Sequence, residues 1–168
     1  MRIRLVVVTD IRGTIARNKD DPVNWSSKED KRFFKQTTSE SGVVVMGRKT
    51  YESIGGRLPG RTNVVMSRQK EINLPQKPDY LISGTPHEVV SLLSGAGYKD
   101  ICVIGGQSVF TQFVDAGLVT DIYLSVEPVL LAGGLNLLEE VSNELTLKLE
   151  RILKLNDNGT INLHYRVY

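Results

Sequence analysis

The chain has 168 residues, enough to bury a substantial core, and we expect one domain over residues 1–168. Hydrophobic residues make up 40% of it and charged residues 24%, as in soluble globular proteins, and the formal charge of +2 is too small to imply nucleic-acid binding. A single cysteine excludes an internal disulfide, and the two histidines, His87 and His164, lie too far apart in sequence to suggest a metal site.

The N-terminal apolar stretch is short and runs into Asp10 and Arg12. It has neither the apolar core nor the cleavage site of a signal peptide, and no apolar stretch of the sequence reaches the length of a transmembrane helix. We therefore expect a cytoplasmic protein that acts on a small molecule, without nucleic-acid or membrane partners, as a monomer or a homodimer.

Short β-branched runs alternate with segments long enough to form helices. Several of these runs are apolar without alternation, as expected for strands that are covered on both faces. Helix-length connections favour parallel pairing, so we predict an α/β fold with a central, mostly parallel sheet of about eight strands flanked by helices. The predicted strands include residues 5–8, 43–46, 63–67, 79–83, 101–104 and 122–126.

Helix start signals lie between these runs. Ser26 and Glu29 have capping-box spacing before a helix that we expect to run to about Thr38. The sequence TPHE at 85–88 combines a second capping box with proline at the first helical position. The tail, roughly residues 145–168, is predicted to form two antiparallel strands joined by an Asn-Asp-Asn-Gly turn.

Asp30 is the most unusual side chain of the first predicted helix. With Phe33, Phe34 and Thr37 it follows the spacing i, i+3, i+4 and i+7, so the four share one face. A carboxylate on an apolar helix face is costly unless a partner pairs with it. Two interpretations stay open at this point. Asp30 either bonds a backbone group at the helix start, or is a carboxylate of raised pKa that grips a cationic or amidine-like ligand in a largely apolar cleft.

Two segments that follow predicted strands suit a phosphate group. Arg48, Lys49 and Thr50 lie at a predicted helix N-terminus, where backbone N–H groups, a hydroxyl and cations come together. Ser67 and Arg68 close another strand and suit a further phosphate, such as the 2′-phosphate that distinguishes NADPH from NADH. A solvated surface turn is the simpler interpretation of each segment taken alone.

The sequence IGGQS at 104–108 also leads from a strand into a helix, which should stop near Gly117. Its adjacent glycines allow close backbone approach, but the pattern is not a full GxGxxG motif. Arg61, after a turn at Pro59 and Gly60, has a guanidinium fork suited to a carboxylate. Residues 47–50, 67–68 and 105–108 thus form three turns that suit an anion, each at the carboxyl end of a predicted strand. Together they predict one extended polyphosphate ligand, a dinucleotide.

Three motifs resemble the dihydrofolate reductase family. The sequence GRKTYESIGGRLPGR at 47–61 is similar to its central signature, WSSKEDKRFF at 25–34 to its first-helix motif and IGGQSVF at 104–110 to its glycine motif. The resemblance covers the chain from residue 3 to about 126. It implies an NADPH-dependent oxidoreductase that reduces 7,8-dihydrofolate to tetrahydrofolate, a reaction of one-carbon metabolism, by hydride transfer to the pteridine ring.

The resemblance implies a role for each matching residue. Asp30 would hold the amino group and a ring nitrogen of the pteridine and help to supply the proton to N5, and Ser125 would bond the same ring edge. The implied substrate contacts are the backbone carbonyl of Val8 and the packing side chains of Phe34, Ile54 and Leu58. Arg61 would pair with the carboxylate of the substrate's glutamate tail. The implied NADPH contacts are Ile15 and Ala16 at the nicotinamide, Arg48, Lys49, Thr50, Ser67 and Arg68 on the adenosine side, Gly105, Gly106, Gln107, Ser108 and Val109 at the pyrophosphate, and Phe110 near the reacting carbon.

The chain departs from the family pattern in four places. The loop from Arg17 to Asn24 is slightly longer and lacks the usual Leu-Pro-Trp, which puts the closure of this loop over the nicotinamide in question. Ala16 replaces a usual glycine and Phe110 a usual tyrosine. The acidic Gly-Asp-Thr motif expected after Ser125 is absent.

Two alternatives follow from these departures. Residues 115–131, DAGLVTDIYLSVEPVLL, resemble the reductase domain of riboflavin biosynthesis, which implies NADPH-dependent reduction of a ribosylaminopyrimidine. Phe110 and the altered loop also leave open a non-catalytic dinucleotide-binding relative. The apolar stretch Val129–Leu138 is either a dimer surface or part of the core.

Overall fold

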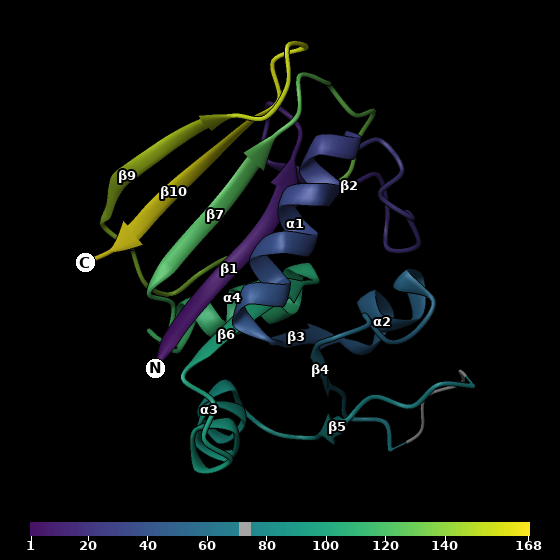
Figure 1. Ribbon diagram of the computed structural model, residues 1–168, viewed down its shortest axis with the longest axis vertical. Coiled ribbons are helices and arrows are strands. Elements are labelled where there is room, and N and C mark those ends of the chain that lie inside the picture. Colours follow the sequence, from purple (N-terminus) through teal and green to yellow (C-terminus); the bar gives the residue numbers. More distant parts are fainter. Residues whose placement is uncertain (71–74) are drawn as a thin grey trace.

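A largely parallel sheet forms the centre of the computed structural model, which describes residues 1–70 and 75–168 (Figure 1). Within these residues eight strands pair in the order β5-β4-β3-β6-β1-β7-β10-β9, and all pairs as far as β7 are parallel. The predicted mostly parallel α/β sheet is thereby confirmed. The strands are β1 (Arg2–Thr9), β3 (Val43–Gly47), β4 (Thr62–Met66), β5 (Tyr80–Ile82), β6 (Asp100–Gly105), β7 (Asp121–Val126), β9 (Leu147–Lys154) and β10 (Ile161–Val167).

Helices cover both faces of this sheet (Figure 1). Side chains alternate along each strand, so Val43 and Val45 of β3 pack in one apolar cluster and Val44 and Met46 in another. The first cluster includes residues of α3 and α4, and the second includes residues of α1 and α2. The helices are α1 (Lys28–Ser41), α2 (Arg48–Ile54), α3 (Pro86–Gly95) and α4 (Gln107–Asp115).

The start of α1 corrects the sequence prediction by one residue. The N-cap is Ser27, not Ser26, and its side chain accepts a hydrogen bond from the N–H of Asp30. The helix runs three residues beyond Thr38 and ends at Gly42, whose φ of 75° lies in the left-handed region that glycine adopts without strain. The shift matters because it places Asp30 in the first helical turn, close to the exposed N–H groups.

The other local signals are confirmed. Thr85 and Glu88 form the predicted capping box of α3, with Pro86 in the first turn. The helix that follows the glycines at 105–106 ends just before Gly117. The tail forms the antiparallel hairpin of β9 and β10. None of the described helices is long and apolar enough to cross a membrane.

A second, two-stranded sheet was not predicted. It pairs β2 (Thr14–Ala16) with β8 (Leu135–Asn136), which lies inside the apolar stretch 129–138. That stretch contributes partly to the core, because Leu131 is buried while Leu130 is largely exposed. Both strands are too short to give a periodic pattern, and their partners lie about 120 positions apart, so local sequence carries no sign of the pairing.

The buried carboxylate of Asp10 joins these two segments. It accepts backbone N–H groups from Arg12 and Thr14 at 2.8 Å, and from Leu131 at 3.0 Å. Burial by itself raises the pKa of Asp10, but these backbone donors outweigh burial and lower the pKa to about 2. The carboxylate is therefore charged at neutral pH and holds the small sheet against the end of β1.

We predict that Asp10→Ala lowers the free energy of unfolding by about 3 kcal/mol at pH 7, because the backbone donors around it lose their acceptor. Urea denaturation followed by circular dichroism measures the change. Asp20→Ala, which removes an exposed carboxylate ten residues away, is the matched control and should cost less than about 0.5 kcal/mol. Equal effects of the two variants would contradict this role of Asp10.

Candidate active site

A cleft of about 1040 Å³ opens at the carboxyl ends of the parallel strands. Its lining includes Val8 of β1, Gly47 at the end of β3, Met66 of β4, Gly105 of β6 and Ser125 of β7. Ligands bind at this edge of open α/β sheets because neighbouring strand ends leave a crevice there. The volume is large enough for more than one flat ring system.

The cleft brings together nearly all the site residues predicted from the sequence. Arg61 is the exception, because it does not line the cleft within the residues described. It is only 8% exposed, and its guanidinium donates to the Thr38 hydroxyl at 2.9 Å and to the Pro59 carbonyl at 3.1 Å. Its pairing with a substrate carboxylate stays a prediction. The predicted residues that do line the cleft are Val8, Ile15, Ala16, Asp30, Phe34, Arg48, Lys49, Thr50, Ile54, Leu58, Ser67, Arg68, Gly105, Gly106, Gln107, Ser108, Val109, Phe110 and Ser125.

Asp30 is a buried acid in the wall of this cleft. Its side chain faces the cleft from α1 although the residue is only 5% exposed. Burial raises the pKa of its carboxyl from the usual 3.8 to about 6, against the opposing effect of a hydrogen bond from the Ser125 hydroxyl. Asp30 is thus poised to exchange a proton near neutral pH, as the second of the two sequence interpretations requires.

Ser125 is oriented by a residue that the sequence reasoning missed. Asn162 lies opposite it on β10, and the amide of Asn162 donates to the Ser125 hydroxyl oxygen at 3.0 Å. Because that oxygen already accepts a bond, the hydroxyl proton is free to point toward Asp30. Asn162, Ser125 and Asp30 therefore form a chain of polar contacts across the end of the sheet, and Asn162 is 3% exposed.

The other half of the cleft is built around two glycines. Gly105 has a φ of 120°, which favours glycine, and a Cβ on Gly106 would lie only 3.2 Å from the Thr50 hydroxyl oxygen. The turn before α4 therefore packs closely against the start of α2. No side chain among the described residues caps α4; the Val109 N–H donates to the Gly106 carbonyl at 3.0 Å, and the two N–H groups before it have no side-chain acceptor.

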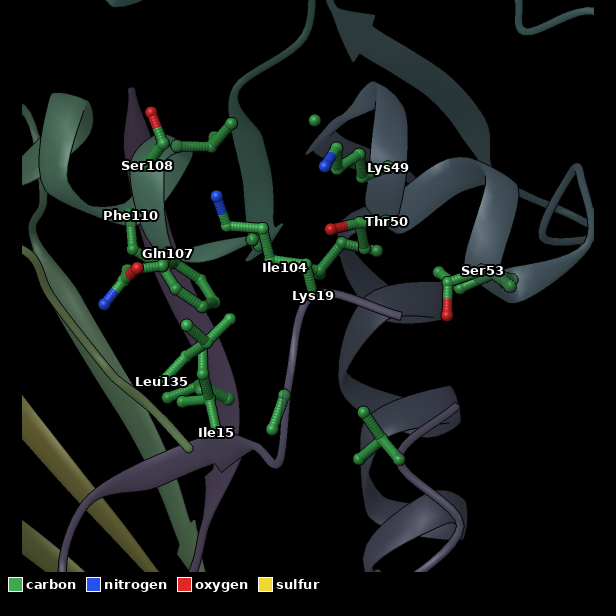
Figure 2. A pocket seen from close by; sticks show the side chains of 18 of the residues that line it. Ile15, Lys19, Lys49, Thr50, Ser53, Ile104, Gln107, Ser108, Phe110 and Leu135 are labelled. Atoms are coloured by element: carbon green, nitrogen blue, oxygen red, sulfur yellow. The ribbon is translucent and has the colours of Figure 1, made fainter. Parts of the chain in front are cut away.

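Cations from two strand ends line this half. Lys49 and Thr50 project from α2 in Figure 2, and Arg68 follows β4. The guanidinium of Arg48 is already paired with Glu52 of its own helix, at 2.7 and 2.8 Å to the two carboxylate oxygens. Lys49 and Arg68 are therefore better placed than Arg48 to meet an anionic ligand.

The loop at 17–24 and the small sheet also line the cleft. Ile15 and Leu135 lie close together in Figure 2, and Lys19 of the loop is a further lining residue. The small sheet adjoins the glycine half, because the Gln107 side chain donates to the Asn136 carbonyl at 3.0 Å. The loop is folded around Asp21, a buried carboxylate that accepts the N–H groups of Arg17 at 2.7 Å and Val23 at 2.9 Å. Sequence reasoning missed Asp21, because an isolated aspartate in a polar loop gives no signal of burial.

Fold and site together define an α/β protein with a large ligand cleft at the carboxyl edge of a parallel sheet. Residues 2–134 match the model of the family described as dihydrofolate reductase. The chain belongs to this family. The dihydrofolate reductase of Haemophilus influenzae is 34% identical over 114 residues, which are 68% of this chain and 66% of that protein, just under two thirds of its length.

Solved structures share the fold over nearly the whole chain. A dihydrofolate reductase from Enterococcus faecalis, complexed with NADP(H) and RAB-propyl, matches with a TM-score of 0.73 and 20% identity, over 99% of this chain and 96% of that one. A pyrimidine reductase-like protein from Corynebacterium diphtheriae matches with a TM-score of 0.82 and 18% identity, over 99% and 92% of the two chains. At these identities the likeness concerns the fold alone.

We predict that Asp30 makes folding stability depend on pH. Its pKa is about 6 in the folded protein against 3.8 in the unfolded chain, so the folded state holds this proton more tightly between these values. The stability of the wild type relative to Asp30→Asn, which does not titrate, should therefore fall by about 2–3 kcal/mol from pH 4 to pH 7. Urea unfolding of both proteins across this range measures the difference. A difference that is constant with pH would show that the pKa of Asp30 is unshifted.

Proposed function

We propose that the protein reduces 7,8-dihydrofolate to tetrahydrofolate with NADPH as the hydride donor. The observation that carries the proposal is the position of Asp30, a buried acid beside Ser125 in the wall of a cleft whose other half suits a dinucleotide. Membership of the dihydrofolate reductase family supports it.

The pteridine half of the cleft combines one acid with apolar walls. In this proposal Asp30 and Ser125 form hydrogen bonds with the amino group and ring nitrogen on one edge of the pteridine. The backbone carbonyl of Val8 is a further hydrogen-bond acceptor in the same pocket. Phe34 and Leu58 of the apolar lining pack against the flat ring. Such an environment orients a planar heterocycle and excludes water from the carbon that receives the hydride.

The residues present fit NADPH. The glycine turn at 105–106 lines the cleft, the start of α4 has no side-chain cap among the described residues, and Lys49 and Arg68 supply positive charge. In the proposal the glycine turn and α4 hold the pyrophosphate, and Ser67 and Arg68 hold the 2′-phosphate. Bound NADPH supplies the hydride.

Asp30 supplies the proton side of the reaction. Reduction of a C=N bond is easier once its nitrogen is protonated. An acid with a pKa near 6 keeps a fraction of its protons at neutral pH and still releases them readily. In the proposal Asp30 transfers its proton toward N5 of the pteridine, directly or through water, while Ser125 holds the carboxyl group in place.

A second candidate is reduction of a ribosylaminopyrimidine. The resemblance of residues 115–131 to the riboflavin-type reductase domain keeps it open, and the pyrimidine reductase-like protein shares the fold. The position of Arg61 outside the cleft lining also weakens the expectation of a glutamate tail. Asp30 and the cofactor residues serve either substrate.

We predict that the purified protein oxidises NADPH when 7,8-dihydrofolate is supplied, followed as loss of absorbance at the reduced nicotinamide band. Asp30→Asn should lower kcat by about 10²- to 10³-fold, because the proton donor is lost. Lowering the pH should not restore activity, since Asn does not take up a proton.

The matched control is Asp20→Asn, an exposed carboxylate outside the cleft lining, which should keep wild-type turnover. Oxidation of NADPH with the ribosylaminopyrimidine but not with dihydrofolate would replace the proposal by the second candidate. NADPH binding without turnover of either substrate would indicate a binding protein.

We predict that Arg68→Ala weakens NADPH binding by about 10- to 100-fold and leaves NADH binding nearly unchanged, because only NADPH carries the 2′-phosphate that Arg68 would bond. Fluorescence titration with each nucleotide gives the two dissociation constants. Lys70→Ala, which removes an exposed cation two residues away, controls for general electrostatics. Equal weakening of NADPH and NADH by Arg68→Ala would rule out this contact.

A further inference from the structure

Glu127 is a buried carboxylate that the proposed reaction does not use. It follows β7 directly and is only 3% exposed, and its N–H donates to the Thr9 carbonyl at 2.9 Å. It does not belong to the cleft lining in the described residues, so a ligand in the cleft does not touch it. A carboxylate is rarely buried without a partner, which raises the question of what holds it there.

Both oxygens of Glu127 accept hydrogen bonds. Oε1 accepts the backbone N–H of Ser27 at 2.6 Å, and Oε2 accepts the Thr160 hydroxyl at 2.7 Å. The Thr160 oxygen in turn accepts from the Asn156 amide at 2.9 Å, which helps to hold the hydroxyl in place. Both carboxylate oxygens of Glu127 therefore serve as acceptors in this arrangement.

Glu127 and Asp30 are both hydrogen-bonded to Ser27, at the start of α1. Ser27, whose N–H binds Glu127, is also the N-cap whose side-chain oxygen accepts the N–H of Asp30 at 3.2 Å. One residue therefore connects the two carboxylates. Among the charged groups that act on Asp30, Glu127 is the anion, from the segment after β7, and Lys31 is the cation, from the helix itself.

The charge of Glu127 opposes the effect of the helix terminus. A carboxylate in the first turn of a helix is normally stabilised in its charged form by the N-terminal end of the helix dipole. A second anion bound at the same terminus disfavours that form, and the repulsion is strong where water is excluded. The negative charge of Glu127 accordingly adds to burial in raising the pKa of Asp30.

We propose that Glu127 is a positioning residue of the active site, which anchors the N-cap of α1 and, through its fixed negative charge, makes Asp30 keep its proton at the pH of the reaction. The role in turnover rests on the proposed function, whereas the coupling between the two carboxylates does not. Glu127 acts through Asp30 and Ser27 and does not contact substrate.

The test compares the titration of Asp30 in three variants at Glu127. Glu127→Gln keeps the size of the side chain and removes its charge, Glu127→Met removes both the charge and the hydrogen bonds, and Glu127→Asp keeps the charge. We expect the two neutral variants to lower the pH at which the Asp30 carboxyl titrates by about one unit, and Glu127→Asp to stay near the wild type. Carboxyl carbon NMR of the ligand-free protein measures each midpoint.

Glu40→Gln, which removes the same charge from the exposed far end of α1, should leave the midpoint unchanged. Glu127→Gln and Glu127→Met place different side chains in the same buried space, so either one that folds is sufficient for the test. Wild-type midpoints in the neutral variants would mean that Glu127 is only structural. A shift of the same size in Glu127→Asp would mean that packing, rather than charge, sets the pKa of Asp30. Either result would overturn the proposal.

The pH profile of turnover gives a second readout. If Asp30 donates its proton, kcat/KM falls with rising pH above the pKa of Asp30, and a midpoint one unit lower reduces kcat/KM at pH 7 by about tenfold in Glu127→Gln. At low pH the variant should approach wild-type kcat/KM. A shifted NMR midpoint in a protein that does not reduce dihydrofolate would refute the proposed function and leave the coupling intact.

Discussion

The pairing of β7 with its two neighbours is the constraint on which the site depends. Parallel pairing with β1 places Val8 opposite Ser125, and antiparallel pairing with β10 places Asn162 opposite Ser125 on the other side. Backbone hydrogen bonds therefore fix three neighbouring site residues across the sheet. A slip of one residue in β7 would turn Ser125 to the other face of the sheet, away from Asp30. The register of the buried strands therefore also fixes the position of Ser125 relative to Asp30.

Helix α1 adds an acid whose environment contains opposing effects. Burial and the anion of Glu127 disfavour the charged form of Asp30, whereas the hydroxyls of Ser125 and Ser26 and the cation of Lys31 favour it. The resulting pKa of about 6 shows that the disfavouring effects dominate. Asp10 shows the opposite balance, because backbone N–H donors outweigh its burial and keep its pKa low. Both carboxylates are buried, so the number of hydrogen-bond donors around each one explains why Asp10 stays charged and Asp30 can exchange a proton.

Local sequence was sufficient wherever the determining neighbours lie within a turn or a strand. Such short spacings predict the helix face that Asp30 shares with Phe34, the capping box at Thr85 and the terminal hairpin. Ser26 and Ser27 show the limit, since adjacent serines offer the same chemistry and tertiary contact decides between them: Ser27 is bound by Glu127, 100 positions away. Asn162 and Glu127 were missed for the same reason, because a pattern of residues does not give the register between distant strands.

Two of the expected departures from the family pattern, the loop at 17–24 and Ala16 of the small sheet, lie in the cover of the cleft. Asp30 and Ser125 lie on a helix and strand whose packing tolerates little change, and the glycine turn is tied sterically to Thr50. The loop around Asp21 and the small sheet that contains Leu135 also line the cleft, and each is held by a buried carboxylate, Asp21 for the loop and Asp10 for the sheet. In the proposal, Asp30 and the cofactor half of the cleft serve either flat ring. Side chains of this cover, such as Lys19, and the guanidinium of Arg61 are in the proposal the candidates for discriminating between a pteridine and a pyrimidine.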